Sequence, residues 1–397
     1  MQKSRFTLRP GSLSRPSLLT IGLLMAAVGS QPANALNKNE TAVFNTLSAC
    51  NNKTDGTSSI CSAGNSLANV KSLNPDQIFG MGSLAARVNG GKTTQPADYF
   101  RLKNRKNIGA GAGDEEFSRL GFWGKVDSNF GSRYTTPKLT GFDFDNHEFV
   151  VGADYRLQDN WVVGSLFSYR HNNAAFDQSR GETDNDSYTG AIYSTYNITD
   201  ALHVEGSASY GGFHYDTLRN INLVGLGSSV AKGSPDGGQY AFSWGGGYDF
   251  NIKALTIAPY ARGEYFNLNV DGFKETGSIG AVQFGKQTIE SAISTVGIQT
   301  SYAISFPWGV LIPQLRGEWH HQYLDGVRKV QTRFVEDPTG RVFNMTSGLP
   351  IRDYYTFGAE VSSVLSGGVS AFLAFETLQG YDDINSNKLV LGTRLEF

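Results

Sequence analysis

The chain is poor in charged residues and has only one long apolar run. Charged residues make up 18% of its 397 residues, and the formal net charge is −2. This balance gives neither a basic surface for nucleic acid nor an acidic tail. Outside the N-terminus no run reaches the roughly 20 apolar residues of a membrane-spanning helix. The strand pattern must therefore decide between a soluble exported protein and a membrane protein.

The single apolar run is typical of a cleaved export signal. Four cations within the first 15 residues precede the apolar stretch 17–29. Residues 33–35 (ANA) fit a small-x-small cleavage site, which leaves Leu36 as the first mature residue. A membrane anchor is the alternative, but 13 residues are too few to span a bilayer. We predict that residues 1–35 are a signal peptide.

Cysteine is scarce, with Cys50 and Cys61 the only two. In an exported chain a closely spaced pair of cysteines predicts a disulfide, and two free thiols are the alternative. Nothing else near the pair resembles a metal site.

Residues 36–118 show no strand pattern. Capping residues and an early proline predict helices over 39–50, 62–72 and 74–88, which begin at Asn39, Ser62 and Asn74. A basic cluster at 101–106 and glycines at 109–113 follow. We expect a short helical segment over 36–91 and a flexible linker over 92–118.

Glycine, phenylalanine and tyrosine are abundant, at 47, 25 and 18 residues, which favours strands and turns. From residue 119 onward, segments of about ten residues alternate apolar and polar side chains. Twelve such segments lie near 120–130, 147–157, 161–173, 187–199, 202–221, 238–251, 255–273, 287–305, 309–323, 351–365, 369–383 and 388–397.

Alternation alone also fits a soluble sandwich. Three further features favour a membrane barrel: an even number of segments, a chain that ends within a strand, and connections of two kinds. Tight turns alternate with long polar connections at 174–186, 224–237, 274–286 and 324–350. The sequence therefore predicts an all-β fold, a 12-stranded antiparallel transmembrane β-barrel over 119–397 that follows the helical segment.

Seven stretches of this predicted barrel resemble motifs of one protein family and follow one another in the same order and at suitable spacing. They are 121–126 (GFWGKV), 150–157 (VVGADYRL), 188–196 (YTGAIYSTY), 258–264 (APYARGE), 271–277 (DGFKETG), 308–321 (WGVLIPQLRGEWHH) and 391–397 (LGTRLEF). Together they resemble the autotransporter β-domain, the translocator of type V secretion, over roughly 118–397.

The resemblance implies a barrel that conveys or anchors its N-terminal segment at the surface of a Gram-negative cell. Part of 74–110 would thread the pore, its basic cluster either pairing with lumen acids or staying solvated. One departure is that only 36–118 is available as passenger, without internal repeats. Implied partners are outer-membrane lipid, the barrel-assembly machinery and periplasmic chaperones. The alternative function is a pore or surface-loop adhesin that exports no passenger.

The resemblance and the strand pattern single out five residues of the barrel. Leu395 and Phe397 belong to the implied C-terminal insertion signal. Trp123, Trp308 and Trp319 are candidates for aromatic girdles at the membrane interfaces.

Motifs for catalysis and cofactors are missing. None of the six histidines is followed two residues later by serine, and no G-x-S-x-G elbow occurs. His320 and His321 are neighbours in a predicted strand, so we expect one to face the lumen and the other the membrane interface. The glycines at 109–113 follow no strand and open no apolar helix, which argues against a dinucleotide site. We expect no enzyme activity, no cofactor and no metal.

Overall fold

The computed structural model describes residues 36–54, 57–79, 119–136, 139–324, 326–348, 351–381 and 383–396. The predicted signal peptide, 1–35, and the whole predicted linker, 92–118, lie outside these residues. Twelve strands of the described part form one barrel. They are β1 (Leu120–Arg133), β2 (Phe142–Gln158), β3 (Trp161–Phe176), β4 (Gly181–Asn197), β5 (Leu202–Leu223), β7 (Asp236–Tyr248), β9 (Leu255–Val270), β12 (Gln287–Tyr302), β14 (Gly309–Gln322), β17 (Asp353–Leu365), β18 (Val369–Gln379) and β19 (Ile384–Glu396).

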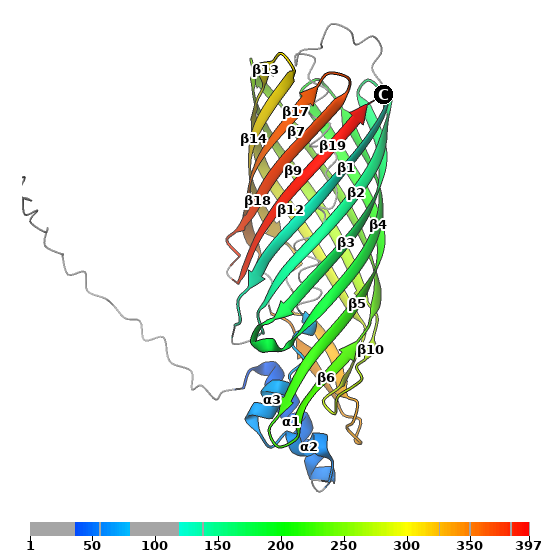
Figure 1. The fold of residues 1–397 in the computed structure, drawn as a ribbon, viewed down its shortest axis with the longest axis vertical. Coiled ribbons are helices and arrows are strands. Elements are labelled where there is room, and N and C mark those ends of the chain that lie inside the picture. Colours follow the sequence, from blue (N-terminus) through cyan, green and yellow to red (C-terminus); the bar gives the residue numbers. More distant parts are fainter. Residues whose placement is uncertain are drawn as a thin grey trace, which may run out of the picture. The chain divides into compact units, whose positions relative to one another are not determined.

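Each barrel strand pairs antiparallel with its neighbours, and the last strand pairs with the first (Figure 1). The β1–β19 ladder runs from Gly121 opposite Glu396 to Arg133 opposite Ile384. Closure leaves no sheet edge whose N–H and C=O groups would face lipid without partners. The predicted fold class, a closed 12-stranded antiparallel barrel after a short helical segment, is confirmed.

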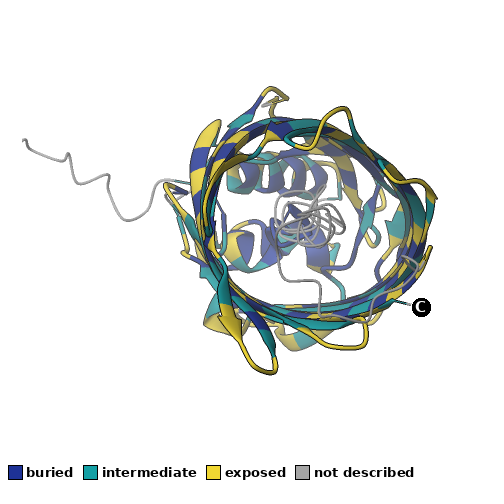
Figure 2. Cartoon of the chain, turned by 90° about the horizontal axis from the view of Figure 1, so that it is seen from above, coloured by how far each residue is buried: buried dark blue, intermediate teal, exposed yellow. Residues whose placement is uncertain are grey.

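Side chains of the barrel alternate between its outside and its lumen. On β2, Phe149 and Val151 are exposed, whereas Glu148 and Val150 are buried. Successive side chains of a strand point to opposite faces, so each strand has one apolar outer face and one inner face that carries charges. Figure 2 looks along the barrel and shows buried and exposed residues alternating around the closed ring.

The chemical character of the two faces reverses toward one end of the barrel, where inward side chains become apolar and outward ones polar. Near the start of β5, Val204 is exposed and His203 is buried. Farther along the same strand, Phe213 and Tyr215 are buried and Asp216 is exposed. Apolar side chains inside and polar ones outside are the arrangement of a water-soluble protein. We infer that the reversal marks where the strands leave the hydrocarbon layer.

The long connections all lie at one end of the barrel, as predicted, and every connection at the other end is short. At the short-turn end, β1 begins at Leu120, which pairs with Tyr155 near the β2–β3 turn, and β19 reaches Glu396. Three of the four long connections contain strands of their own. The strands within these connections are β6 (Gly227–Gly233), β10 (Phe273–Lys274), β11 (Val282–Phe284), β15 (Lys329–Phe334) and β16 (Val342–Thr346). Two small strands, β8 (Phe250–Ile252) and β13 (Ile304–Phe306), edge the short-turn end.

One predicted long connection is wrong. Residues 174–186 are mostly strand, because β3 extends to Phe176 and β4 starts at Gly181. A single 3₁₀ turn, η1 (Asp177–Ser179), joins the two strands. The polar side chains that suggested a loop alternate along β4: Glu182, Asp184 and Asp186 lie on the outer face, whereas Thr183 and Asn185 are buried on the inner face.

The N-terminal segment is helical. It contains α1 (Lys38–Thr54), α2 (Ser59–Ala63) and α3 (Leu67–Leu73). The predicted cap of α1 is wrong by two residues: Asn37 and Glu40 form a reciprocal capping box, with Asn37 Oδ1 accepting from the Glu40 N–H and Glu40 Oε2 from the Asn37 N–H, both at 2.8 Å. The predicted second helix, 62–72, is split at Gly64, whose absent Cβ would lie 2.5 Å from that of Leu47. Of the predicted third helix, 74–88, residues 74–79 are described. Only residues 78 and 79 are helical, and the predicted start is wrong, because Asn74 is the C-cap of α3 and residues 74–77 are coil and turn.

The outward apolar band is tested by placing a charge on it. Leu391 lies on the outer face of β19 and is 60% exposed. Leu391→Lys should destabilise the inserted barrel by about 2–4 kcal/mol, because lipid does not solvate the ammonium group. The measurement is the fraction of heat-modifiable folded barrel in a urea series. Leu226→Lys, in the β5–β6 turn and 48% exposed, is the control and should have no effect; equal losses in the two variants would contradict the assigned band.

Candidate functional site

The two ends of the segment that links helices to barrel lie at opposite ends of the barrel. The helical segment contacts the long connections, since the Val224 N–H donates to Asn69 Oδ1 (2.7 Å) and the Asn222 N–H to Ser72 Oγ (2.8 Å). β1 begins at the short-turn end, at Leu120. Residues between Phe79 and Leu120 therefore connect one end of the barrel to the other.

Helices and long connections share one hydrophobic core. Val43 and Leu47 of α1 have no exposed surface, and neither do Ile221 of β5 and Met345 of β16. All belong to a single buried cluster that also includes side chains of α3, β9, β11 and β15. Burying one such side chain stabilises the folded state by about 1.5–3 kcal/mol. The segment 36–79 is thus packed as part of the same folded unit as the connections.

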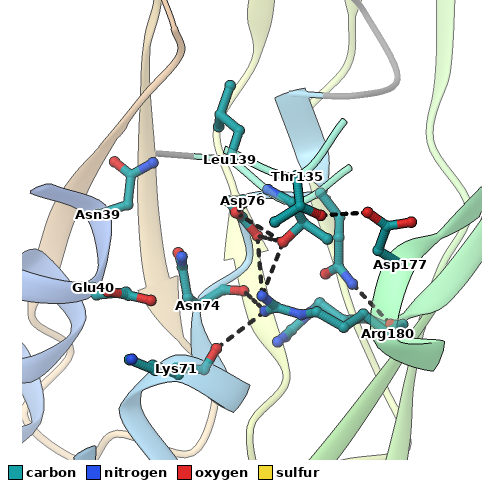
Figure 3. A network of polar contacts seen from close by, with 12 residues as sticks. Asn39, Glu40, Lys71, Asn74, Asp76, Thr135, Leu139, Asp177 and Arg180 are labelled. Carbon is teal, nitrogen blue, oxygen red and sulfur yellow. Dashed lines mark hydrogen bonds and ion pairs between the residues drawn. The ribbon is translucent and has the colours of Figure 1, made fainter. Parts of the chain in front are cut away.

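Arg180, in the turn between β3 and β4, fastens the end of α3 to the barrel (Figure 3). Its Nη2 donates to the carbonyl oxygens of Lys71 (3.1 Å) and Asn74 (2.6 Å). Its Nη1 donates to Thr140 Oγ1 (3.0 Å) and lies 3.6 Å from Asp76 Oδ1. A cation at the last carbonyls of a helix satisfies groups that have no partner within the helix. Burial lowers the pKa of Arg180 and the Asp76 carboxylate opposes that effect.

Arg219 of β5 makes a second attachment to the same helix end. Its Nε and Nη2 donate to the two carboxylate oxygens of Glu275 at 3.1 and 2.6 Å. Nη2 also donates to the Gly280 carbonyl (2.8 Å), and Nη1 to the Leu73 carbonyl (3.5 Å). Both charged side chains are at most 5% exposed. A buried bidentate pair of this kind fixes geometry, because either charge alone would be strongly unfavourable there.

Asn39 attaches the other end of the segment. Its Nδ2 donates to the Thr346 carbonyl (2.9 Å), and its Oδ1 accepts from the Thr346 N–H (2.8 Å). The side-chain amide of Asn39 thus bonds to both the N–H and the C=O of Thr346, as the backbone of a neighbouring strand would. The residue predicted to cap α1 instead joins α1 to the β15–β16 hairpin.

The Sγ atoms of Cys50 and Cys61 are bonded in the structure, and their Cα atoms lie 5.3 Å apart. The bond joins α1 to α2 within the shared core. Asp337, in the β15–β16 turn, places Oδ1 3.0 Å from the Cys50 sulfur. That carboxylate also accepts from the Thr339 N–H (2.8 Å), so its position is set by its own turn.

Within the apolar band, the lumen is lined by paired charges. Asp127 Oδ2 lies 2.8 Å from Lys125 Nζ and 2.9 Å from Lys388 Nζ. Further pairs include Arg170–Glu148 (3.0 Å), Arg394–Asp154 (2.7 Å), Arg316–Glu376 (2.7 Å) and Arg262–Glu205 (3.4 Å). A lumen of this kind is polar and carries both signs of charge, as in barrels whose interior is wet.

The three tryptophans do not share one environment. The girdle prediction for Trp123 is wrong: it faces the lumen, is 8% exposed, and donates from Nε1 to Tyr193 Oη (2.8 Å). Trp308, at the short-turn end, is 50% exposed and stacks on Phe306. Trp319, on the outer face of β14 toward the other end, is 40% exposed. Trp308 and Trp319 stay candidates for two different girdles.

Neighbouring histidines of β14 point to opposite faces. His320 is buried in the lumen, with Nδ1 2.8 Å from Thr295 Oγ1 and Nε2 2.9 Å from Thr356 Oγ1. His321 pairs with Asp353 on the outside (2.8 Å). Leu395 lies on the outer face of β19 and is 41% exposed, and Phe397 lies outside the described residues.

Sequence reasoning missed Arg180 and Arg219, which donate to backbone carbonyls of the helical segment, and Glu275, which pairs with Arg219. The signal for Arg219 was the reversed pattern of β5, because Arg219 is the one charged residue among the inward positions 213–223, and a buried charge requires a partner. Among the described residues, no helix is long and apolar enough to cross a bilayer.

A closed barrel with an apolar exterior, a charged lumen and short and long connections at opposite ends is an outer-membrane-type barrel. The profile of the family described as "Autotransporter beta-domain" matches residues 122–376. The chain therefore belongs to the autotransporter β-domain family, whose barrels reside in the bacterial outer membrane.

Solved structures agree with this membership. The barrel is similar to the translocator domain of the autotransporter NalP from Neisseria meningitidis, with a TM-score of 0.57 at 15% identity over 72% of this chain and 90% of that one. It is also similar to the β domain of the Bordetella autotransporter Brka, with a TM-score of 0.51 at 17% identity over 70% of this chain and 100% of that one. At these identities the likeness shows the fold.

Relatives in sequence are longer proteins. Lipase 1 of Photorhabdus luminescens is 24% identical over 247 residues, 60% of this chain and 34% of the lipase. Esterase EstA of Pseudomonas aeruginosa is 23% identical over 215 residues, 52% of this chain and 32% of the esterase. The chain thus spans about one third of the length of these relatives.

The Arg219–Glu275 pair is tested by breaking it and then replacing it. Arg219→Met should destabilise the packed segment by about 3–5 kcal/mol, because it leaves Glu275 charged, buried and unpaired. Limited proteolysis of residues 36–79 in the purified full chain measures this. The double variant Arg219→Met, Glu275→Leu should recover most of the resistance. Arg333→Ala, at an exposed arginine, is the control. Equal proteolysis of Arg219→Met and wild type would contradict the attachment.

The disulfide is tested by alkylation. Without reductant, denatured protein from the outer membrane should take up no maleimide, and with reductant it should take up two. Cys50→Ala with Cys61→Ala should lower the stability of the packed segment by about 3 kcal/mol, the loop-closure value for a ring of this size. Two maleimides taken up without reductant would show free thiols instead.

Proposed function

We propose that the chain is an outer-membrane autotransporter translocator whose barrel carries its own residues 36–79 to the cell surface and keeps them there. One observation supports this proposal most strongly. The helical segment packs on the long-connection end of the barrel, whereas β1 starts at the short-turn end. In outer-membrane barrels the long connections are extracellular and the short turns periplasmic. The residues between Phe79 and Leu120 must then cross the membrane. A path through the polar lumen would not expose their backbone N–H and C=O groups to lipid.

The passenger is retained rather than released in this proposal. Its core residues are shared with β5, β9, β15 and β16, and three attachments, at Asn39, Arg180 and Arg219, join it to the barrel. A segment of 44 residues rarely folds alone without such support. The domain boundaries at 35, 91 and 118 belong to the same proposal: signal peptide, helical passenger, linker and barrel.

We assign no catalytic step to this chain. Two relatives are named a lipase and an esterase, but only about a third of each matches. Acyl-transfer enzymes with a serine nucleophile usually need a base such as histidine, and residues 36–79 contain none. In the barrel, threonine hydroxyls contact both ring nitrogens of His320. The implied partners are outer-membrane lipid, the barrel-assembly machinery, which would recognise the strand that ends in Leu395 and Phe397, and periplasmic chaperones.

Cysteine labelling in intact cells tests the orientation. Asn45→Cys on the exposed face of α1 and Ser228→Cys on β6 should react with a membrane-impermeant maleimide. Asp200→Cys, in the exposed β4–β5 turn, should react only after the outer membrane is permeabilised. Wild-type protein, whose two cysteines are bonded, is the unlabelled control.

The pattern of labelling separates the two functions. Protection of position 45 with labelling of position 228 would mean that the barrel is inserted but the segment stays periplasmic. That result would replace the translocator with the pore or surface-loop adhesin.

A further inference from the structure

The second sheet, β10-β11-β15-β16, has two unlike faces. Side chains of one face are buried in the core shared with the helices: Val282, Phe284, Val330, Phe334, Phe343 and Met345. The opposite face is exposed, and nothing among the described residues packs on it. A sheet with one face in a core and one in water is normal, so the composition of the outer face decides whether it has a further role.

The exposed face is cationic. Lys274 of β10, Lys329 and Arg333 of β15 are all exposed. The four strands contain no aspartate or glutamate. Exposed acids of the adjoining connections, Asp271 and Glu336, lie outside the strands. An ordinary solvated surface mixes both signs, so this separation of charge creates a positive potential over the sheet.

Strand pairing spaces the cations and places amides between them. Lys274 pairs with Gln283, and Gln283 pairs with Arg333, so the three side chains form one row across the sheet. Gln283 Oε1 accepts from Arg333 Nε (3.0 Å) and Nη2 (2.6 Å), which holds the guanidinium against the sheet. Gln331 and Asn344 pair in the next row, and Lys329 starts the strand beyond them.

The face begins close to the outer rim of the membrane band. Trp319 and Tyr323, 40% and 59% exposed, lie on the outer face where β14 ends. Lys329 opens β15 six residues after Tyr323. Aromatic side chains at this position mark the level of lipid headgroups. The cationic sheet therefore rises from the headgroup level into the medium.

We infer that the exposed face of β10-β11-β15-β16 is a docking surface for the phosphorylated sugar headgroups of the outer-leaflet glycolipid. Phosphate groups pair with Lys274, Lys329 and Arg333, and sugar hydroxyls bond to the amides of Gln283, Gln331 and Asn344. The surface ties the cap made of residues 36–79 and the long connections to the lipid around the barrel. This inference rests on the proposed orientation, with the long connections outside the cell.

The composition of the face favours a glycan over a protein partner. Protein interfaces usually centre on buried aromatic and aliphatic side chains. Among the described residues, Val342 is the one large apolar side chain that is exposed on the outer face of these strands. Cations interleaved with amides suit a partner that presents phosphates and hydroxyls. A second copy of the chain would have to bind through charge alone.

Binding of a soluble headgroup to the purified full chain tests the inference. The probe is deacylated lipopolysaccharide, which keeps the phosphorylated sugars and lacks the acyl chains that bind any barrel. Calorimetric titration at low salt compares wild type with the variant Lys274→Gln, Lys329→Gln, Arg333→Gln. The variant should bind at least about tenfold more weakly, and wild-type affinity should fall as salt is added. The exposed positions make a folding defect easy to exclude by heat-modifiability.

The matched control removes three exposed lysines elsewhere: Lys38→Gln, Lys53→Gln and Lys253→Gln. This control variant has the same net charge as the Lys274→Gln, Lys329→Gln, Arg333→Gln variant, and it should bind the probe like wild type. Equal losses in both variants, or equal wild-type binding to a probe stripped of its phosphates, would overturn the inference. So would wild-type binding no tighter than that of inorganic phosphate, or a change of oligomeric state in the variant without a change in probe binding.

The labelling pattern at positions 45 and 228 keeps the two claims distinguishable. If Ser228→Cys is labelled in intact cells but the probe does not bind, the docking inference alone fails. If Ser228→Cys is not labelled, the orientation itself is wrong.

Discussion

The structure depends on one constraint: lipid cannot hydrogen-bond to a peptide group. A strand inside the membrane must find partners on both sides, so the sheet must close, and the antiparallel pairing of β1 with β19 closes it. Closure places every outward side chain against lipid and every inward one in the lumen. The apolar exterior, the charged pairs around Asp127 and Asp154, and the alternation visible in the sequence all follow from this.

The same strands obey a different rule once they leave the membrane. Water surrounds their outer face there, so Asp216 faces outward and Tyr215 inward. Inward apolar side chains at the end of an open barrel need a covering layer, and the helical segment supplies it. Helices without their own complete core and strands with an uncovered apolar interior thus complete each other. The arginines at positions 180 and 219 fix the register of this contact at the end of α3.

Local patterns predicted the barrel because side-chain alternation is local. Each predicted segment overlaps a barrel strand, and the placement of His320 and His321 on opposite faces followed from parity alone. The same parity argument applied to Trp123, which is two residues from Lys125 and four from Asp127, places it in the lumen. The girdle prediction for Trp123 is wrong because position along the strand, and not residue type, decides which face of the barrel a side chain occupies.

Other features could not be obtained from local patterns. The strands β10, β11, β15 and β16 are two to six residues long and gain their stability from the helices they cover. The contact of Asn39 with Thr346 spans 307 positions, and the Arg219–Glu275 pair spans 56. Such pairs depend on the tertiary fold, and a single sequence carries no record of which partner each polar side chain meets.

Amide hydrogen exchange of the full chain in lipid nanodiscs tests most directly whether helices and long connections form one folded unit. We expect α1 and α3 to be protected to the same extent as β6, β15 and β16, and Arg219→Met to lower protection in all of them together while the barrel strands within the membrane are unchanged. Helices that exchange fully at the first time point, beside connections that stay protected, would show that residues 36–79 are not packed on the barrel.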